Sequence, residues 1–205
     1  MQIFCLGDSI TDSGHLFINP PLGDGYVHKL SLKLLQRGTN CSITNLGMNG
    51  FTISRLLDST LPRLPKQTDI ITVLIGINDI GLMMNTFRTP QQQTEMMALF
   101  FEKYRELLQL LVPKTSCLIL MEPFIFPFPA EYQNWIPYVK TMSEGIEKLA
   151  CEYHLPYLLL HDDLNAAAAW YGADALTEDG IHLTSAGHEI ITEKLFALLQ
   201  RSLSL

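Results

Sequence analysis

The chain has 205 residues, 47% of them hydrophobic, and a formal net charge of −7. A chain of this length and apolar content can bury one sizeable core, so we expect a single domain over residues 1–205. Nucleic acids and anionic membranes both prefer a basic surface, so the negative charge argues against either as the main partner. No apolar run approaches the ~20 residues that cross a bilayer.

The four cysteines lie far apart and form no Cys-x-x-Cys pair. Cys5 and Cys117 fall in apolar runs that are typical of strands. This usage favours reduced core thiols in a cytosolic protein over a disulfide framework or a metal site. The first six residues, 1–6, are too short for the core of a signal peptide and lack a basic flank. We therefore expect a cytoplasmic protein that acts on small molecules.

Apolar runs alternate with amphipathic stretches along the chain. Strand-like runs fall near residues 2–6, 41–46, 69–75, 116–121 and 156–160. Helical periodicity falls near residues 25–37, 52–58, 90–112, 132–153, 162–170 and 185–202. Five strands separated by helices predict right-handed crossovers and a parallel sheet. The expected fold is α/β, with three α/β/α layers around a five-stranded, flavodoxin-like sheet.

Four short blocks carry the residues that hydrolysis of an ester through a serine requires. They are Gly7-Asp8-Ser9-Ile10, Asn45-Leu46-Gly47-Met48-Asn49-Gly50, Gly76-Ile77-Asn78-Asp79 and Asp179-Gly180-Ile181-His182. The reaction needs a nucleophile, a base, a carboxylate that holds the base, and donors for the oxyanion. Ser9, His182 and Asp179 fit the first three roles. The backbone N–H groups of Ser9 and Gly47 and the side-chain amide of Asn78 fit the fourth.

The predicted fold brings these blocks together. In open α/β sheets, ligands bind beyond the carboxyl ends of the strands. Ser9 follows the first predicted strand, Gly47 the second and Asn78 the third. Asp179 and His182 follow the fifth strand and a short helix, just before the last helix. The blocks therefore fall where the fold is expected to place a site.

On these blocks the chain resembles the SGNH/GDSL hydrolase family, named for residues that stand here as Ser9, Gly47, Asn78 and His182. Within that family it is most similar to bacterial acetylxylan esterases and related carbohydrate deacetylases. Further matching stretches are Leu22-Gly23-Asp24-Gly25-Tyr26-Val27, Ile119-Leu120-Met121-Glu122-Pro123-Phe124 and Ser185-Ala186-Gly187-His188. The resemblance implies an acyl-serine mechanism without cofactor or metal. It also implies that the substrate is a small ester, such as an acetylated oligosaccharide.

Polar residues near the blocks are candidates for binding substrate or for bracing the loops. Asp8 and Asn49 fit a bracing role better than a reactive one. His15 stands where the similar esterases often carry arginine, and Glu178 where they tend to carry an aromatic residue. These two departures leave the alcohol part of the substrate open.

Two further segments, residues 82–88 and 123–129, follow strands at the same rim. They predict the walls of the acyl and alcohol pockets, with Met83 and Phe124 among the wall residues. Buried packing beneath a loop is the other interpretation of their apolar side chains.

Two alternatives remain open. A lysophospholipase or thioesterase uses the same machinery on a longer acyl chain. A flavodoxin-like binding module would hold a phosphate in the turn over residues 7–11, but neither a Gly-x-Gly-x-x-Gly nor a P-loop motif supports it. The natural ester, the acyl length and the oligomeric state do not follow from the sequence.

Overall fold

The computed structural model of the protein describes residues 1–203 and contains a five-stranded sheet. Its strands are β1 (Gln2–Gly7), β2 (Ser42–Gly47), β3 (Thr68–Leu74), β4 (Thr115–Met121) and β5 (Tyr157–Leu158). They lie in the order β2-β1-β3-β4-β5, and every neighbouring pair is parallel. In this register Gly7 pairs with Gly47 on one side and with Leu74 on the other. The three strands that precede the first three blocks therefore end at one level.

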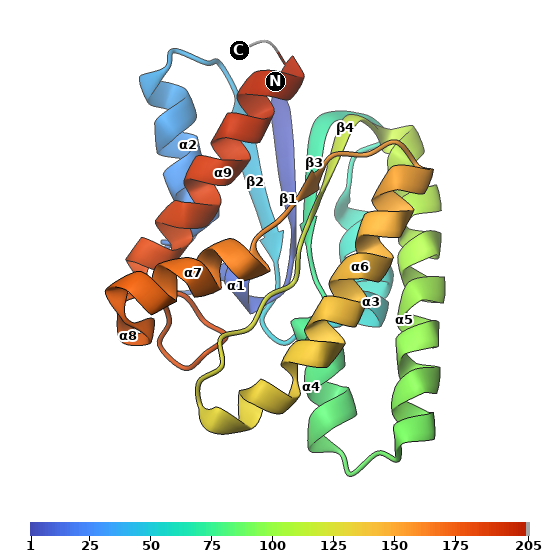
Figure 1. Ribbon diagram of the computed structural model, residues 1–205. Helices are drawn as coiled ribbons and strands as arrows, with labels where there is room; N and C mark the ends of the chain where they lie inside the picture. The colour runs from blue at the N-terminus through green and yellow to red at the C-terminus, as the bar shows by residue number, and fades with distance from the viewer. Residues whose placement is uncertain (204–205) are drawn as a thin grey trace.

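Helices cover both faces of the sheet, which confirms the predicted fold class (Figure 1). One face carries α2 (Tyr26–Gln36), α7 (His161–Tyr171), α8 (Ala173–Leu176) and α9 (Ser185–Leu203). The other carries α3 (Ile53–Arg55), α4 (Ile77–Asn85), α5 (Pro90–Leu111) and α6 (Ile136–Glu152). The short α1 (Ser9–Asp12) follows β1 directly. Shorter helical turns are η1 (Leu56–Thr60), η2 (Leu61–Arg63), η3 (Val112–Lys114) and η4 (Ala130–Asn134).

Helix α5 shows how local sequence sets an element. Thr89 and Gln92 form a reciprocal capping box at its start, and Pro90 occupies the first turn. Phe100 and Tyr104 are buried at helical spacing and so turn one face of the helix to the sheet. The predicted boundaries near 90–112 agree with this helix.

Helix α4 is not predicted from the sequence patterns. The apolar run of β3 continues into it without a polar break, so strand and helix signals merge. Gly76 separates them, because its φ of 136° is one that a residue with a side chain rarely adopts. Ile77, Ile80 and Met83 are then buried along one face of the helix.

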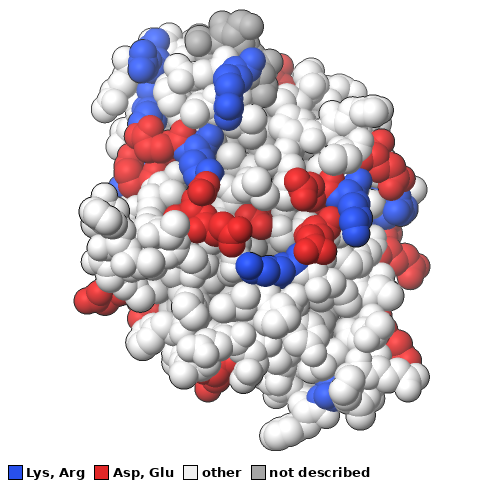
Figure 2. Space-filling model, in the orientation of Figure 1, with Lys and Arg blue, Asp and Glu red and all other residues white. Residues whose placement is uncertain are grey.

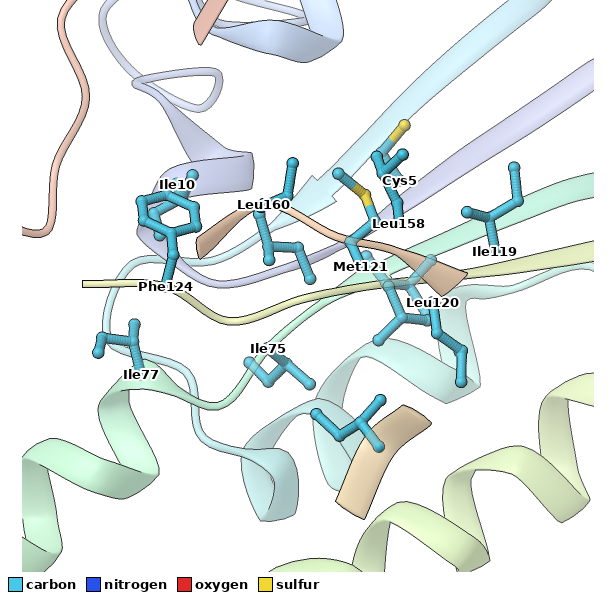
Figure 3. Close-up of a cluster of buried hydrophobic side chains, with 14 of the residues drawn as sticks. Cys5, Ile10, Ile75, Ile77, Ile119, Leu120, Met121, Phe124, Leu158 and Leu160 are labelled. Carbon is cyan, nitrogen blue, oxygen red and sulfur yellow. The ribbon is translucent and has the colours of Figure 1, made fainter. Parts of the chain in front are cut away.

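The segments just beyond the carboxyl ends of the strands, at the rim of the sheet, pack into the same hydrophobic core as the strands themselves. Figure 3 shows part of this buried cluster. Its labelled members come from the strands and from the segments just beyond them: Cys5, Ile10, Ile75, Ile77, Ile119, Leu120, Met121, Phe124, Leu158 and Leu160. Loops that carry polar groups at the rim therefore have a packed base.

Strand β5 is short and is fastened to β4 by one carboxylate as well as by the ladder. The N–H of Glu122, just beyond β4, donates to the carbonyl of Leu158 at 2.9 Å. The Glu122 carboxylate accepts the N–H groups of Leu160 at 2.5 Å and His161 at 2.7 Å. Side-chain bonds therefore replace part of the strand pairing that two residues cannot supply.

Charges on the surface are mixed. On the face shown in Figure 2, lysines and arginines lie beside acidic side chains. Ion pairs join Lys33 to Glu193 and Lys194 to Asp163 between helices. Exposed pairs of this kind add little to stability. Within residues 1–203, no helix combines the length and the apolar content needed to cross a membrane.

Candidate active site

Ser9 is positioned by the end of β1. Asp8 precedes it and caps α1, because its buried carboxylate accepts the N–H of Ile10 at 3.0 Å. A Cβ on Gly7 would lie 2.5 Å from the carbonyl oxygen of Leu74, so only glycine fits at position 7, two residues before Ser9. The central strands of the sheet thus determine where the Ser9 hydroxyl stands.

His182 reaches Ser9 from the loop that precedes α9. Its Nε2 lies 2.9 Å from Ser9 Oγ, and its Nδ1 lies 2.6 Å from an oxygen of Asp179. The other Asp179 oxygen accepts the backbone N–H groups of Ile181 at 2.9 Å and His182 at 2.8 Å. A carboxylate at Nδ1 holds the proton there and leaves Nε2 as the acceptor for the serine hydroxyl.

The Asp179 carboxyl is suited to holding a protonated imidazole. Partial burial acts to raise its pKa, but the hydrogen bonds from the His182 ring and from two backbone N–H groups outweigh that effect. The pKa of Asp179 therefore lies below its ordinary value. The group is ionised at neutral pH and can stabilise positive charge on His182.

The loop that carries this pair is braced from within. Thr177 and Leu183 form an antiparallel bridge across it. The Thr177 hydroxyl donates to the carbonyl of His182 at 2.7 Å and accepts the N–H of Gly180 at 2.8 Å. Gly180 has a φ of 92°, and a Cβ there would lie 1.6 Å from the carbonyl oxygen of Phe128. The loop geometry therefore requires glycine at this position.

Gly47 has a different role from the predicted one. Its N–H donates to the side-chain oxygen of Asn45 at 2.9 Å. A Cβ on Gly47 would lie 2.3 Å from the backbone nitrogen of Asp12. The glycine allows β2 to pack against α1, and its amide is not free to bind an oxyanion, which corrects the assignment from sequence.

The free amide of this block belongs to Gly50. Gly50 has a φ of 73° in the turn from Met48 to Phe51, which the N–H of Phe51 closes on the carbonyl of Met48 at 3.1 Å. Asn78 Nδ2 donates to the carbonyl of Phe51 at 2.9 Å, so this turn and the Asn78 amide lie together. Within the described part of the chain, the N–H groups of Gly50 and Ser9 have no hydrogen-bond partner. An Asn-Gly pair is a turn signal, but the sequence does not show which of the two glycines in the block presents a free N–H.

The buried Asp8 and the partly buried Asp79 support Ser9 and the same turn. Asp79 accepts the N–H of Ile53 at 3.1 Å, just after the turn. Burial raises the pKa of Asp79 to about 7 against the effect of that hydrogen bond, and the charge of Asp8 adds to the rise. Burial likewise raises the pKa of Asp8 to about 7. Among residues 1–203, no cluster of three or more His, Cys, Asp or Glu side chains is placed to hold a metal ion.

A cleft of about 760 Å³ opens at Ser9 and His182. Its apolar lining includes Leu16, Phe17, Ile18 and Met48, and its polar lining includes Asp12, Asp24, Asn49, Glu178 and His188. None of the described lining residues is a lysine or arginine. A bound ester would therefore meet apolar side chains and carboxylates that no lysine or arginine of the described lining offsets, close to Ser9.

The candidate polar residues divide into two groups. Asn49 and Glu178 line the cleft. Asp8 and His15 are buried outside its lining, which agrees with a bracing role for Asp8 and corrects the interpretation of His15 as a substrate-binding residue. His15 Nδ1 lies 2.8 Å from a carboxylate oxygen of Asp12, so the ring braces the loop after α1.

The predicted pocket walls lie elsewhere. Met83 and Phe124 are fully buried in the core, and neither of the segments 82–88 and 123–129 lines the cleft. Apolar side chains that follow a strand can pack down into the core as well as outward, and here they pack down. This corrects the assignment of Met83 and Phe124 to substrate binding.

Much of the apolar wall belongs instead to Leu16, Phe17 and Ile18 in the 13–24 loop, which were not predicted to line the cleft. Ser13 Oγ donates to Asp24 at 2.7 Å, and Asn19 Nδ2 donates to the same carboxylate at 3.1 Å. The loop is thus closed on itself while Phe17 and Ile18 stay 91% and 77% exposed. The sequence signal for this wall was the apolar triplet Leu16-Phe17-Ile18, which lies between Gly14 and Gly23.

The strand order and the site at the carboxyl edge of the sheet are those of the SGNH type of hydrolase fold. The chain belongs to the GDSL-like lipase/acylhydrolase family, whose sequence model matches residues 5–190. It is therefore a carboxylic ester hydrolase by family, as the four blocks predicted.

Solved structures share this fold. An acetylxylan esterase from Geobacillus stearothermophilus is 22% identical, with a TM-score of 0.77 over 96% of this chain and 92% of that one. A Parabacteroides merdae protein described as a GDSL-like lipase is 23% identical, with a TM-score of 0.80 over 96% and 94%. An alpha/beta hydrolase from the metagenome of Lake Arreo, Spain, is 21% identical, with a TM-score of 0.79 over 96% and 93%. No curated protein was found to match the chain.

Proposed function

We propose that the protein removes short acyl groups, acetyl above all, from esters of a sugar or a similar alcohol through an acyl-serine intermediate. The observation that carries this proposal is the hydrogen-bonded series Ser9–His182–Asp179, with distances of 2.9 and 2.6 Å, at the mouth of an open cleft. The polar part of the cleft lining and the likeness to an acetylxylan esterase support the choice of substrate.

In the acylation step, Ser9 Oγ attacks the ester carbonyl while His182 Nε2 takes the hydroxyl proton. The carbonyl electron pair moves to the oxygen, which the N–H groups of Ser9 and Gly50 and the Asn78 amide stabilise. The tetrahedral intermediate collapses, the alcohol leaves with the proton from His182, and an acyl-serine remains.

In the deacylation step, His182 removes a proton from water as the water oxygen attacks the acyl-serine carbonyl. Collapse of the second intermediate releases the carboxylic acid and returns the proton to Ser9. Asp179 stabilises the imidazolium in both steps. Every proton taken is given back, so no cofactor is required.

Labelling with a fluorophosphonate tests the nucleophile and separates an enzyme from a flavodoxin-like binding module. We expect one label per chain, located on Ser9 by peptide mass, and none in Ser9→Ala. A folded wild-type protein that stayed unlabelled and failed to hydrolyse p-nitrophenyl acetate would favour the binding module.

A second candidate function is hydrolysis of longer acyl chains, and the observation that favours it is the exposed pair Phe17 and Ile18 on the cleft wall. Each methylene that such a wall buries adds ~0.8 kcal/mol, roughly fourfold in kcat/KM. Our proposal expects kcat/KM for p-nitrophenyl esters to fall beyond butyrate. A steady rise from acetate to octanoate, lost in Phe17→Ser but kept in the equally exposed Phe87→Ser, would establish the second candidate instead.

We further propose that the enzyme acts in the cytoplasm. Cys5 supports this as a core thiol, because it is buried and not paired in a disulfide. Fractionation of cells that express the protein, followed by detection of the intact chain, tests the location.

A further inference from the structure

A second histidine, His188, lines the cleft beside the catalytic one. It lies on α9 and is only 5% exposed. The N–H of Tyr26, the first residue of α2, donates to its Nδ1 at 3.2 Å. This N–H has no acceptor within its own helix, and Gly25 supplies no side-chain cap, so the imidazole takes that place.

The bond to Nδ1 decides where the proton of the ring is. A neutral imidazole has one N–H and one acceptor nitrogen, so an acceptor at Nδ1 means a donor at Nε2. Burial lowers the pKa of His188 to about 4, although Asp24 acts to raise it; the charges of Lys29 and His182 add to the lowering. The ring is therefore neutral at physiological pH, with its hydrogen on Nε2.

The Nε2–H group is open to the cleft. It has no hydrogen-bond partner among residues 1–203. In this part of the chain, the unpartnered side-chain atoms that are sealed from solvent belong to Thr60, Thr72 and Tyr104. The Nε2 atom of His188 is therefore unpartnered but not sealed from solvent. A Cβ on residue 25 would lie 2.8 Å from His188 Cε1, so only a glycine there leaves the ring undisturbed. A donor that faces the cleft without a protein partner is free to bind an acceptor on a ligand.

We propose that His188 Nε2–H binds an oxygen of the alcohol part of the substrate and selects a neutral, hydroxylated alcohol such as a sugar. This inference rests on the proposed ester hydrolysis and extends it. The rest of the polar lining agrees with it, since Asp12, Asp24 and Glu178 offer acceptors to hydroxyl groups. A phosphorylated alcohol would face three carboxylates with no lysine or arginine among the described lining residues to offset its charge.

Two substitutions separate the two nitrogen atoms of His188. In H188N the amide oxygen can replace Nδ1 as the acceptor for Tyr26, while the donor to the cleft is lost. In H188Q the amide nitrogen can replace Nε2 as the donor, while the acceptor for Tyr26 is lost. H28Q, on α2 and outside the cleft lining, is the matched control for a histidine replacement.

The substrates are methyl 2-O-acetyl-xyloside and p-nitrophenyl acetate, which share the acyl group and differ in the alcohol. We expect H188N to lose about tenfold in kcat/KM on the sugar acetate, the usual effect of one lost hydrogen bond, and to stay within about twofold on the aryl acetate. H188Q should keep most of the preference for the sugar and lose thermal stability. H28Q should match the wild type on both substrates.

Equal losses on the two acetates in H188N, or no loss on either, would overturn the role of His188 and leave the proposed esterase standing. A wild-type protein that hydrolyses neither acetate would overturn both. Nitrogen-15 NMR of the histidine rings keeps the test independent of how the variants fold. We expect an Nε2–H tautomer whose Nε2 signal shifts when the sugar acetate is added to folded Ser9→Ala protein. An Nδ1–H tautomer, or an Nε2 signal unchanged at saturation, would contradict the proposal.

Discussion

The two halves of the proposed catalytic site are held in different ways. Ser9 stands at the end of a central strand, where the backbone is so crowded that Gly7 and Gly47 cannot carry a side chain. Asp179 and His182 stand on a loop, with side chains 51% and 45% exposed, and depend on a few local hydrogen bonds. The position of the nucleophile is thus a property of the sheet, whereas the position of the base is a property of the loop.

Removing the nucleophile breaks both halves of the site at once. We expect Ser9→Ala to lower kcat about 10⁴- to 10⁶-fold with an unchanged thermal midpoint, because members of such a group act as a unit. The double variant Ser9→Ala/His182→Ala should be little slower than Ser9→Ala. Steady-state kinetics measure both, and losses that multiplied would mean that His182 acts independently of Ser9.

A substitution in the part of the site that the sheet holds should lower the free energy of unfolding. In Gly47→Ala the new Cβ meets the backbone of α1, and overpacking of this kind costs about 3 kcal/mol. Gly50→Ala has open space and carries only the strain of its positive φ, about 1–2 kcal/mol. Urea denaturation should place Gly47→Ala well below Gly50→Ala. The reverse order would contradict the close packing of Gly47 against α1.

A substitution in the loop that carries Asp179 and His182 should lower kcat more than it lowers the stability of the fold. Thr177→Val removes the hydroxyl that bonds to His182 and Gly180 and leaves a buried N–H unpaired, at a cost of about 1–3 kcal/mol. Because the damage is confined to the loop, we expect kcat to fall about tenfold and the thermal midpoint to fall by at most about 2–4 °C for each kcal/mol of that cost. Thr44→Val on the exposed face of β2 is the control. A large drop in the midpoint with normal kcat would show that the loop is not an independent unit.

The smallest effect concerns pH and the partly buried Asp79. Its pKa is raised to about 7 in the folded protein from an ordinary value of 3.8, so the folded state binds the proton more tightly than the unfolded state. The contribution of this group to stability is then full below pH 4 and is lost as the pH rises through 7. Asp79→Asn keeps an acceptor for Ile53 and removes the titration. Its thermal midpoint should fall less between pH 5 and pH 8 than that of the wild type, and parallel curves would contradict the assignment.

The sequence predicted those features that depend on local patterns. All five strands and most helices follow from runs of apolar residues bounded by turns, and the residues of the Ser9–His182–Asp179 series follow from the chemistry of the blocks. The direction of a side chain at the end of a strand depends on tertiary packing, so Met83 and Phe124 could not be placed. The same applies to backbone amides, since only the folded turn shows that Gly50 presents a free N–H.

The two-residue strand β5 has a consequence for the cooperativity of unfolding. The segment that carries Asp179 and His182 leaves the sheet from its weakest strand, which the carboxylate of Glu122 helps to fasten. Such a segment can open by itself while the other four strands stay folded. Amides of the loop from Thr177 to Leu183 should then exchange with solvent sooner than those of β1 and β3. Activity should also disappear at a lower denaturant concentration than the fold, so inactivation of this enzyme begins as a local event at the sheet edge.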